Sequence, residues 1–384
     1  MVLTLNGVDN LMEKIYLDYN ASTPIDPEVV GAMKPYLTNY FGNPSTSHWA
    51  GKPAKEALNK ARNQIARLLN CSLEEIIFTS GGSESNNHAL KGVFFANKDK
   101  GNHIITTQIE HPTIMNICKY LENFGAKITY IGVDQYGRVS PQDIEAAITE
   151  QTILISVMHA NNEVGTVQPI SEIAEVAKKY NVLFHTDAAQ SVGKIPANVK
   201  ELDVDLLSLA GHKLYAPKGI GALYIKEGTI IDSFIHGASH EKGRRAGTEN
   251  VLLAVGLGKA CELVSDFNSS QTILELRDYF RDNLKEYFKE TVKFNGHLKE
   301  CLPNTLNVSF IGNSGENILA EIPQIAASTG SACHSGNVEL SSVLKAMGVT
   351  EHAGKGTIRF SLGRYTTIDE INSAIEQLKK VVKI

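Results

Sequence analysis

The stretch VLFHTDAA, residues 182–189, is a short apolar run that ends on a carboxylate. A run of this length with polar residues around it predicts a buried strand, which places Asp187 at the carboxyl end of that strand. A helical pattern that starts at Ser171 comes before it, and a second apolar run, LLSLAGHKL at residues 206–214, follows it. This succession is typical of a parallel sheet whose strands are joined by helices.

The same alternation continues from residue 53 to residue 225. The other strand-like runs are EIIFTS, HIITTQIE, KITYIGV, TILISVMHA and GALYI. Helical patterns separate them, among them the amphipathic PAKEALNKARNQIARLLN and a helix that Gly125 ends as a C-terminal cap. We therefore expect an α/β fold with a mostly parallel seven-stranded sheet and helices on both of its faces.

The pattern changes after residue 250. Two long helices are followed by the short strands NTLNVSF and TIRFSLG, and a capping box from Thr367 to Glu370 opens a last helix. We expect a large ligand-binding domain over residues 15–250 and a smaller α+β domain over residues 251–384. Residues 1–25 are expected to pack on the smaller domain.

Composition narrows the class of protein. The net charge of −5 argues against a nucleic-acid-binding protein, and the apolar runs are shorter than the ~20 residues of a membrane helix. The first residues lack a basic segment followed by an apolar one, which is the pattern of a secretion signal.

The five cysteines are odd in number and widely spaced, with no CxxC pair, which favours a reducing, cytoplasmic location. We expect no metal site, because Gly237 interrupts the only close histidine pair, His236 and His240.

Polar residues follow several of the predicted strands. Because ligands of such sheets bind beyond the carboxyl ends of the strands, these residues are expected to converge on one rim. They are Gly81-Gly82-Ser83, His111, Asn161-Asn162, Asp187 and Lys213.

Each of these residues has a chemical and a structural interpretation. The SGGSESNN segment could hold a phosphate at a helix start or be an ordinary glycine turn. Lys213 could form a Schiff base or be a solvated surface lysine. Asp187 could pair with a pyridinium nitrogen or cap a helix, and His111 could stack on a flat ring or be structural.

Arg359, in the strand TIRFSLG, could clamp a carboxylate or be an exposed strand charge. Taken together and in this order, a phosphate cradle, a Schiff-base lysine, an aspartate for a ring nitrogen and a stacking histidine predict a pyridoxal phosphate (PLP) enzyme.

Cys333 lies in TGSACHSG, residues 329–336, among small residues that could not hold a structural cysteine in a packed site. We interpret this segment as a loop that makes the thiol accessible and mobile. Cys118 and Cys261 fall in helical patterns and are expected in or near the core, whereas no chemistry is assigned to Cys71 or Cys301.

The chain resembles the cysteine desulfurases, a family of fold-type I PLP enzymes, from about Ile15 to its C-terminus. The motifs that carry the resemblance are YLDYNASTP, FGNPSTSH, IIFTSGGSESNN, IEHPTI, ANNEVG, HTDAAQSVGK, GHKLYAPKGIGALY, GRRAGTEN and GSACHSG.

The resemblance implies a role for each site residue. Lys213 would hold PLP, His111 would stack on its ring, Asp187 would pair with the ring nitrogen, and Gln190 would bind the phenolic oxygen. The phosphate would be bound by Gly82, Ser83, His212 and, from the neighbouring subunit of a homodimer, Thr248. Asn162 and Arg359 would bind the substrate carboxylate, and Cys333 would be the nucleophile.

The implied reaction converts L-cysteine to L-alanine and leaves a persulfide on Cys333, from which sulfur passes to an acceptor or iron–sulfur scaffold protein. Three positions depart from the family pattern: Ala210, Ser83 and His334 stand where relatives often carry Ser, Thr and Thr. A missing hydroxyl at Ala210 would weaken PLP binding.

Several alternatives remain open. The ACHS sequence also resembles selenocysteine lyases, in which Cys333 need not act in the same way. A plain aminotransferase would not need a cysteine in a loop, and a non-catalytic scaffold would not need Lys213, Asp187 and Cys333 together. A nicotinamide-dependent oxidoreductase is less favoured, because no GxGxxG opens the first strand–helix unit.

Overall fold

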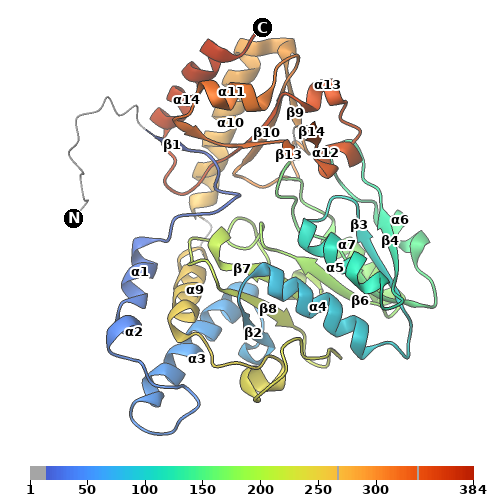
Figure 1. Cartoon of the computed structure of the whole chain (residues 1–384), viewed down its shortest axis with the longest axis vertical. Helices are drawn as coiled ribbons and strands as arrows, with labels where there is room; N and C mark the ends of the chain where they lie inside the picture. The colour runs from blue at the N-terminus through green and yellow to red at the C-terminus, as the bar shows by residue number, and fades with distance from the viewer. Residues whose placement is uncertain (1–13, 266–267, 335–336) are drawn as a thin grey trace.

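The computed structural model describes residues 14–265, 268–334 and 337–384. Its centre is a seven-stranded sheet in the order β2-β8-β7-β6-β5-β3-β4, in which only β8 runs antiparallel to its neighbours (Figure 1). The strands are β2 (Ile76–Thr79), β3 (His103–Thr107), β4 (Lys127–Ile131), β5 (Thr152–Ser156), β6 (Leu183–Asp187), β7 (Leu206–Ala210) and β8 (Gly221–Ile225). This confirms the predicted α/β fold and its mostly parallel sheet.

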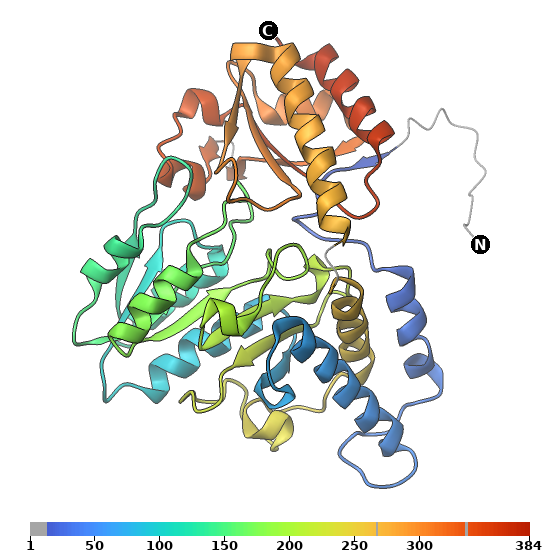
Figure 2. The same ribbon diagram turned by 180° about the vertical axis from the view of Figure 1, so that it is seen from behind.

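Helices cover both faces of this sheet because successive strand residues point to opposite sides. Leu206 packs with α4 (Gly82–Ala96) and α5 (Pro112–Glu122), whereas Leu207 packs with the other helix layer. That second layer contains α3 (Gly51–Leu69), α6 (Pro141–Ala147), α7 (Ile170–Lys179), α8 (Val199–Leu202) and α9 (Val251–Leu263). Figure 2 shows α3 and α9 side by side on this layer.

A second, antiparallel sheet has the order β12-β15-β10-β9. Its strands are β9 (Val292–Asn295), β10 (Thr305–Phe310), β12 (Ser328–Thr329) and β15 (Thr357–Ser361). Helices α10 (Asn268–Phe288), α11 (Gly315–Glu321) and α14 (Ile368–Val381) lie beside it in a separate hydrophobic cluster (Figure 1). The predicted capping box of Thr367 and Glu370 opens α14.

The start of the described chain joins this second sheet region. Strand β1 (Ile15–Tyr16) pairs in parallel with β11 (Ile325–Ala326), and Ile15 and Leu17 belong to the same hydrophobic cluster as α10 and α14. The segment that follows β1 therefore runs between the two sheets before it enters α1 (Pro27–Met33) and α2 (Pro35–Thr38).

Local differences from the predictions are small. Helix α5 ends at Glu122, and Gly125 adopts a φ of +90° in the turn beyond it. The run LLSLAGHKL leaves strand geometry at Gly211, where a 3-10 turn, η2 (Gly211–Lys213), turns Lys213 away from the sheet.

The sequence around Cys333 predicts a loop, but its backbone forms a hairpin of β13 (Ser331–His334) and β14 (Asn337–Leu340). The remaining elements are α12 (Ser342–Ala346), α13 (Glu351–Gly354), η1 (Leu73–Glu75), η3 (His240–Gly243) and η4 (Lys289–Thr291).

Among the described residues, no helix is both long enough and apolar enough to cross a membrane.

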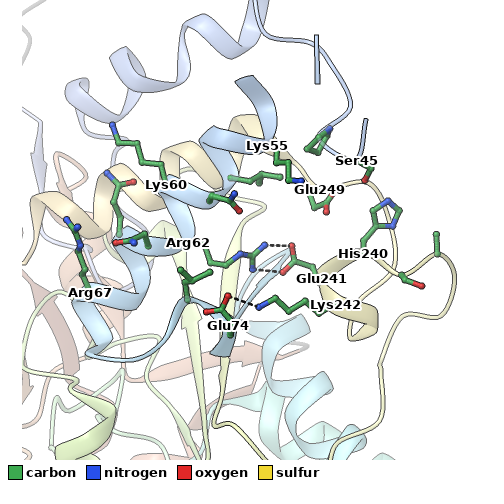
Figure 3. A pocket seen from close by; sticks show the side chains of 18 of the residues that line it. Ser45, Lys55, Lys60, Arg62, Arg67, Glu74, His240, Glu241, Lys242 and Glu249 are labelled. Carbon is green, nitrogen blue, oxygen red and sulfur yellow. Dashed lines mark hydrogen bonds and ion pairs between the residues drawn. The ribbon is translucent and has the colours of Figure 1, made fainter. Parts of the chain in front are cut away.

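A buried ion pair covers the outer side of the edge strand β2 (Figure 3). Arg62 of α3 makes two hydrogen bonds to the Glu241 carboxylate, of 2.7 and 2.8 Å. Glu241 also accepts from the Phe78 amide, and Arg62 donates to the Ile76 carbonyl. The pair therefore satisfies backbone groups on the open side of β2, which an edge strand would otherwise leave unpaired.

Replacing Arg62 with methionine should lower the free energy of unfolding by about 3 kcal/mol, because it leaves the Glu241 carboxylate buried and unpaired. Urea denaturation of parent and variant at equal protein concentration measures this. Lys242→Met is the matched control, since Lys242 makes an exposed 3.6 Å pair with Glu74, and it should change stability by no more than about 0.5 kcal/mol. Equal losses of unfolding free energy in the two variants would contradict a stabilising role for the buried Arg62–Glu241 pair.

Candidate active site

A cavity of about 430 Å³ lies at the carboxyl ends of the parallel strands and reaches across to β15 of the second sheet. Nine of the residues singled out in the sequence line it: Gly82, Ser83, His111, Asn162, Asp187, Gln190, His212, Lys213 and Arg359. The convergence of residues from α4, α5, β6 and β15 follows from the topology, because the carboxyl ends of parallel strands meet at one edge.

Lys213 extends from the 3-10 turn η2 into the cavity. Its Nζ donates to the backbone carbonyls of Asn20, at 2.6 Å, and Ala21, at 2.8 Å. Burial, followed by the nearby charge of Arg359, lowers the pKa of the Lys213 amine to about 8. More of this amine is therefore neutral at mildly alkaline pH than in an ordinary lysine, as a nucleophilic lysine requires.

Asp187 lies at the end of β6 and is fixed on both carboxylate oxygens. Oδ1 accepts from the Ala189 amide at 2.9 Å, and Oδ2 accepts from Asn86 Nδ2 at 2.6 Å. Asp187 does not cap a helix, because the next described helix after β6 is α8 at Val199; its side chain lines the cavity instead. A carboxylate held in this way can stabilise a protonated ring nitrogen.

His111 is the N-cap of α5, and its Nδ1 accepts from the Thr113 amide at 3.2 Å. This contact leaves Nε2 as the ring nitrogen that is free to meet a ligand. Burial by the surrounding protein is the main cause that lowers the His111 pKa, with a further contribution from Lys213. A neutral imidazole on the cavity wall can stack on a flat ring and exchange protons.

The end of the cavity at which a phosphate is expected is formed by the N-terminus of α4. Gly81 precedes the helix with a φ of +147°, which favours glycine. A Cβ on Gly82 would come within 3.3 Å of the Ala210 Cβ, so glycine keeps this end open. Burial lowers the pKa of His212 to about 4, so its imidazole is neutral.

Taken together, these residues fit PLP. An amine with a lowered pKa, a fixed carboxylate, an imidazole and a helix N-terminus match the aldehyde, ring nitrogen, ring face and phosphate of that cofactor.

Arg359 connects the two sheet regions on the cavity wall. Its NH1 donates to the Asn162 carbonyl at 2.9 Å, and its NH2 donates to Asp18 at 2.7 Å and to Ser328 at 2.9 Å. Nε is buried without a partner among the described residues. Arg359 is therefore not an exposed strand charge: only about a tenth of its side chain is exposed.

Two predicted site residues are not placed in this cavity. Thr248 is exposed and is not among the residues that line it. Cys333 belongs to β13, where its Cα pairs with that of Val338, but its side chain lies outside the described part of the structure.

Cys118 and Cys261 are fully buried, as expected, and burial raises the pKa of each thiol to about 12. Neither is suited to act as a nucleophile.

Three residues that hold the site together were not predicted from the sequence. Asn20 presents the carbonyl that Lys213 and Gln190 both contact, Asn86 holds Asp187, and Lys194 contacts Gln190. Asn86 could have been found, because it stands four residues after Gly82 and so lies on the same face of α4. Nothing local in the sequence links Asn20 to Lys213.

A larger hollow of about 1260 Å³ lies beside α3 (Figure 3). Two ion pairs, Arg62–Glu241 and Lys242–Glu74, lie among its labelled side chains, and its lining includes none of the residues of the PLP constellation. We therefore place the candidate active site in the smaller cavity, where titratable groups with shifted pKa values converge.

The chain is similar over nearly its whole length to several known proteins. The family profile Aminotransferase class-V matches residues 15–373. The chain is 48% identical to a protein named cysteine desulfurase IscS from Dictyoglomus turgidum, over 97% of this chain and 95% of that protein. Among solved structures, a NifS-like protein superposes with a TM-score of 0.90 at 36% identity, covering 96% of this chain and 99% of that one. A structure described as SspA in complex with cysteine has a TM-score of 0.81 at 39% identity, covering 92% and 100%.

With a cavity that fits PLP and relatives of this similarity over nearly its whole length, the chain belongs to the class-V aminotransferase family and, within it, to the PLP-dependent cysteine desulfurases.

Proposed function

We propose that this protein converts L-cysteine to L-alanine and transfers the sulfur through Cys333 to an acceptor. The observation that carries the proposal is the Lys213 amine, which shares one cavity with Asp187 and Arg359 and whose pKa is lowered to about 8. This combination supports amine chemistry on an amino-acid substrate at neutral pH.

When bound, PLP supplies an electron sink for the substrate carbon. The residues of the cavity would hold it in place: Lys213 would bind the aldehyde, Asp187 would keep the ring nitrogen protonated, and His111 would stack on the ring. Gln190 donates to the phenolic oxygen. The amides at Gly82 and Ser83, with His212, bind the phosphate.

Arg359 and Asn162 are proposed to bind the substrate carboxylate. The guanidinium is held on the cavity wall by Asp18 and by the carbonyl of Asn162, so its direction is set before substrate arrives. With PLP bound, the Lys213 amine, whose pKa is lowered to about 8, would be the base that takes the α-proton of the substrate.

The Cys333 thiolate is proposed to attack the sulfur of the bound cysteine. An S–S bond forms, the substrate C–S bond breaks, and its electron pair remains on the carbon, which takes up a proton to give alanine. The persulfide left on Cys333 then passes its outer sulfur to an acceptor protein that builds iron–sulfur clusters or thiolated cofactors. The thiols of Cys71, Cys118, Cys261 and Cys301, which are free, support a reducing, cytoplasmic location.

The second candidate is a selenocysteine lyase, which the ACHS sequence favours. Parallel turnover measurements with cysteine and selenocysteine separate the two. A non-catalytic scaffold is less well supported, because such a protein would have no need for a desolvated Lys213 facing a fixed Asp187.

We further propose a homodimer. Leu37, Phe41 and Trp49 are 66%, 78% and 80% exposed, which is unusual for three large apolar side chains along one segment. The hollow of Figure 3 is bordered by Pro44 and Ser45 from this segment and by Glu249, which follows Thr248. The apolar segment and Thr248 therefore border the same region, which supports a second copy covering both.

Cys333→Ser should keep the visible absorbance of bound PLP but reduce alanine formation from cysteine to less than about one hundredth, because the nucleophile is lost. Alanine, sulfide and the mass of the protein after incubation with cysteine are measured. Cys71→Ser is the matched control and should retain activity, because burial raises the pKa of that thiol to about 12. Full activity in Cys333→Ser would remove Cys333 from the mechanism.

The rate at which the apoprotein captures PLP should depend on pH through the neutral form of Lys213. Since the amine pKa is lowered to about 8, the rate should rise as the pH increases through 8 and then level off. Stopped-flow absorbance from pH 6 to 11 measures the midpoint. A midpoint near the ordinary lysine value of about 10.4 would show that the amine is not desolvated.

Phe41→Asp should convert the dimer to monomers and raise the PLP dissociation constant, because Thr248 then loses contact with the neighbouring phosphate. Sedimentation velocity and PLP titration measure the two effects. Ile230→Asp, a change at another exposed apolar residue (55% exposed), is the control and should leave the dimer intact.

Thr248→Val should weaken PLP binding without dissociating the dimer. Unchanged PLP binding would rule out a role of Thr248 in phosphate binding.

A further inference from the structure

Lys194 is a half-buried lysine next to the cavity, behind the residues that line it. Its Nζ lies 2.8 Å from Gln190 Oε1 and 3.0 Å from Asn20 Oδ1. Among residues 14–265, 268–334 and 337–384, no carboxylate forms an ion pair with it. A lysine withdrawn from water without a counter-ion is costly, so its presence calls for a specific explanation.

The contact with Gln190 determines how the amide of that side chain is oriented. A lysine nitrogen offers hydrogens, so the amide atom facing it must be the oxygen, Oε1. Nε2 therefore lies on the other side, where it donates to the Asn20 carbonyl at 2.9 Å. Since an amide nitrogen carries two hydrogens, one remains for a ligand in the cavity that Gln190 lines.

We propose that Lys194 is a positioning residue that fixes the amide of Gln190 with its NH₂ group toward the bound cofactor. This inference rests on the proposed function, in which Gln190 donates to the phenolic oxygen of PLP. With the amide reversed, Oε1 would face that oxygen, and two acceptors would repel each other in place of a hydrogen bond.

A lysine suits this role better than a neutral polar side chain. A hydroxyl or an amide at this position could either donate or accept, so both orientations of Gln190 would be allowed. Burial and the charges of Lys213 and Arg359 hold the pKa of Lys194 well below its ordinary range. A protonated lysine can only donate. A neutral amine still keeps two hydrogens for the two oxygens it contacts, and the Asn20 carbonyl, which can only accept, then holds Nε2 on the other side of the amide.

The alternative is that Lys194 only supports Asn20. The Asn20 Oδ1 atom also accepts from Asn304 Nδ2 at 3.0 Å. Asn304→Ala therefore removes a comparable hydrogen bond to the same oxygen without touching Gln190, which makes it the matched control.

The test is a double-mutant cycle on the PLP-loaded protein, with the PLP dissociation constant and the position of the bound cofactor's visible band as readouts. In the parent chain, Lys194→Met should weaken PLP binding about fivefold, the value of one hydrogen bond, and should shift the band. In the Gln190→Ala background, Lys194→Met should leave the band where it is and weaken PLP binding less than about twofold, because the amide that Lys194 orients is gone. Lys194→Gln, a second variant in case the first folds poorly, should also shift the band, since its amide can present an acceptor.

Equal effects of Lys194→Met in the two backgrounds, or a band shift in Asn304→Ala, would overturn the positioning role and leave the proposed function intact. If Gln190→Ala by itself changes neither the band nor the dissociation constant, the proposed contact of Gln190 with the cofactor fails, and the inference fails with it.

Discussion

The site depends on one constraint: the amine of Lys213 is held out of bulk water by two backbone carbonyls, those of Asn20 and Ala21. Carbonyls stabilise the hydrogens of an amine without supplying the full negative charge that would keep it protonated. Burial, followed by the nearby charge of Arg359, lowers the pKa of the amine to about 8. Because the carbonyls lie more than 190 residues from Lys213 in sequence, the chemistry requires the whole fold.

Asn20 is the point at which the two sheets and the lysine meet. Its side chain contacts Lys194, Asn304 and Thr305, while its carbonyl receives hydrogens from Lys213 and Gln190. The segment that carries it is fixed by pairing of β1 with β11 and by the Asp18–Arg359 ion pair, whose N···O distance is 2.7 Å. Arg359 is thus shared: it lowers the Lys213 pKa and it ties the second sheet to the segment that binds the lysine.

The sheet and most of the cavity could be predicted from the sequence because each depends on local patterns. Apolar runs of strand length end on Asp187 and near Lys213, and parallel topology then brings those ends together. The roles of Asn20 and Lys194 could not be predicted in this way, since their partners are chosen by long-range packing and not by periodicity. The segment of Cys333 was misjudged for a related reason: small residues indicate a loop, but pairing of β13 with β14 does not require large side chains.

Ala210 adds a consequence for the phosphate end of the cavity. It lies at the end of β7, close to Gly82, where a serine hydroxyl would have been a further donor to a phosphate. Without that hydroxyl, the proposed phosphate donors within one chain are the α4 amides, Ser83 and the neutral His212, whose lowered pKa removes the option of a positive charge. The chain therefore has a greater need for a donor from outside itself. In the proposed dimer that donor is Thr248 of the second copy, so retention of the cofactor and association of the subunits become linked, each stabilising the other.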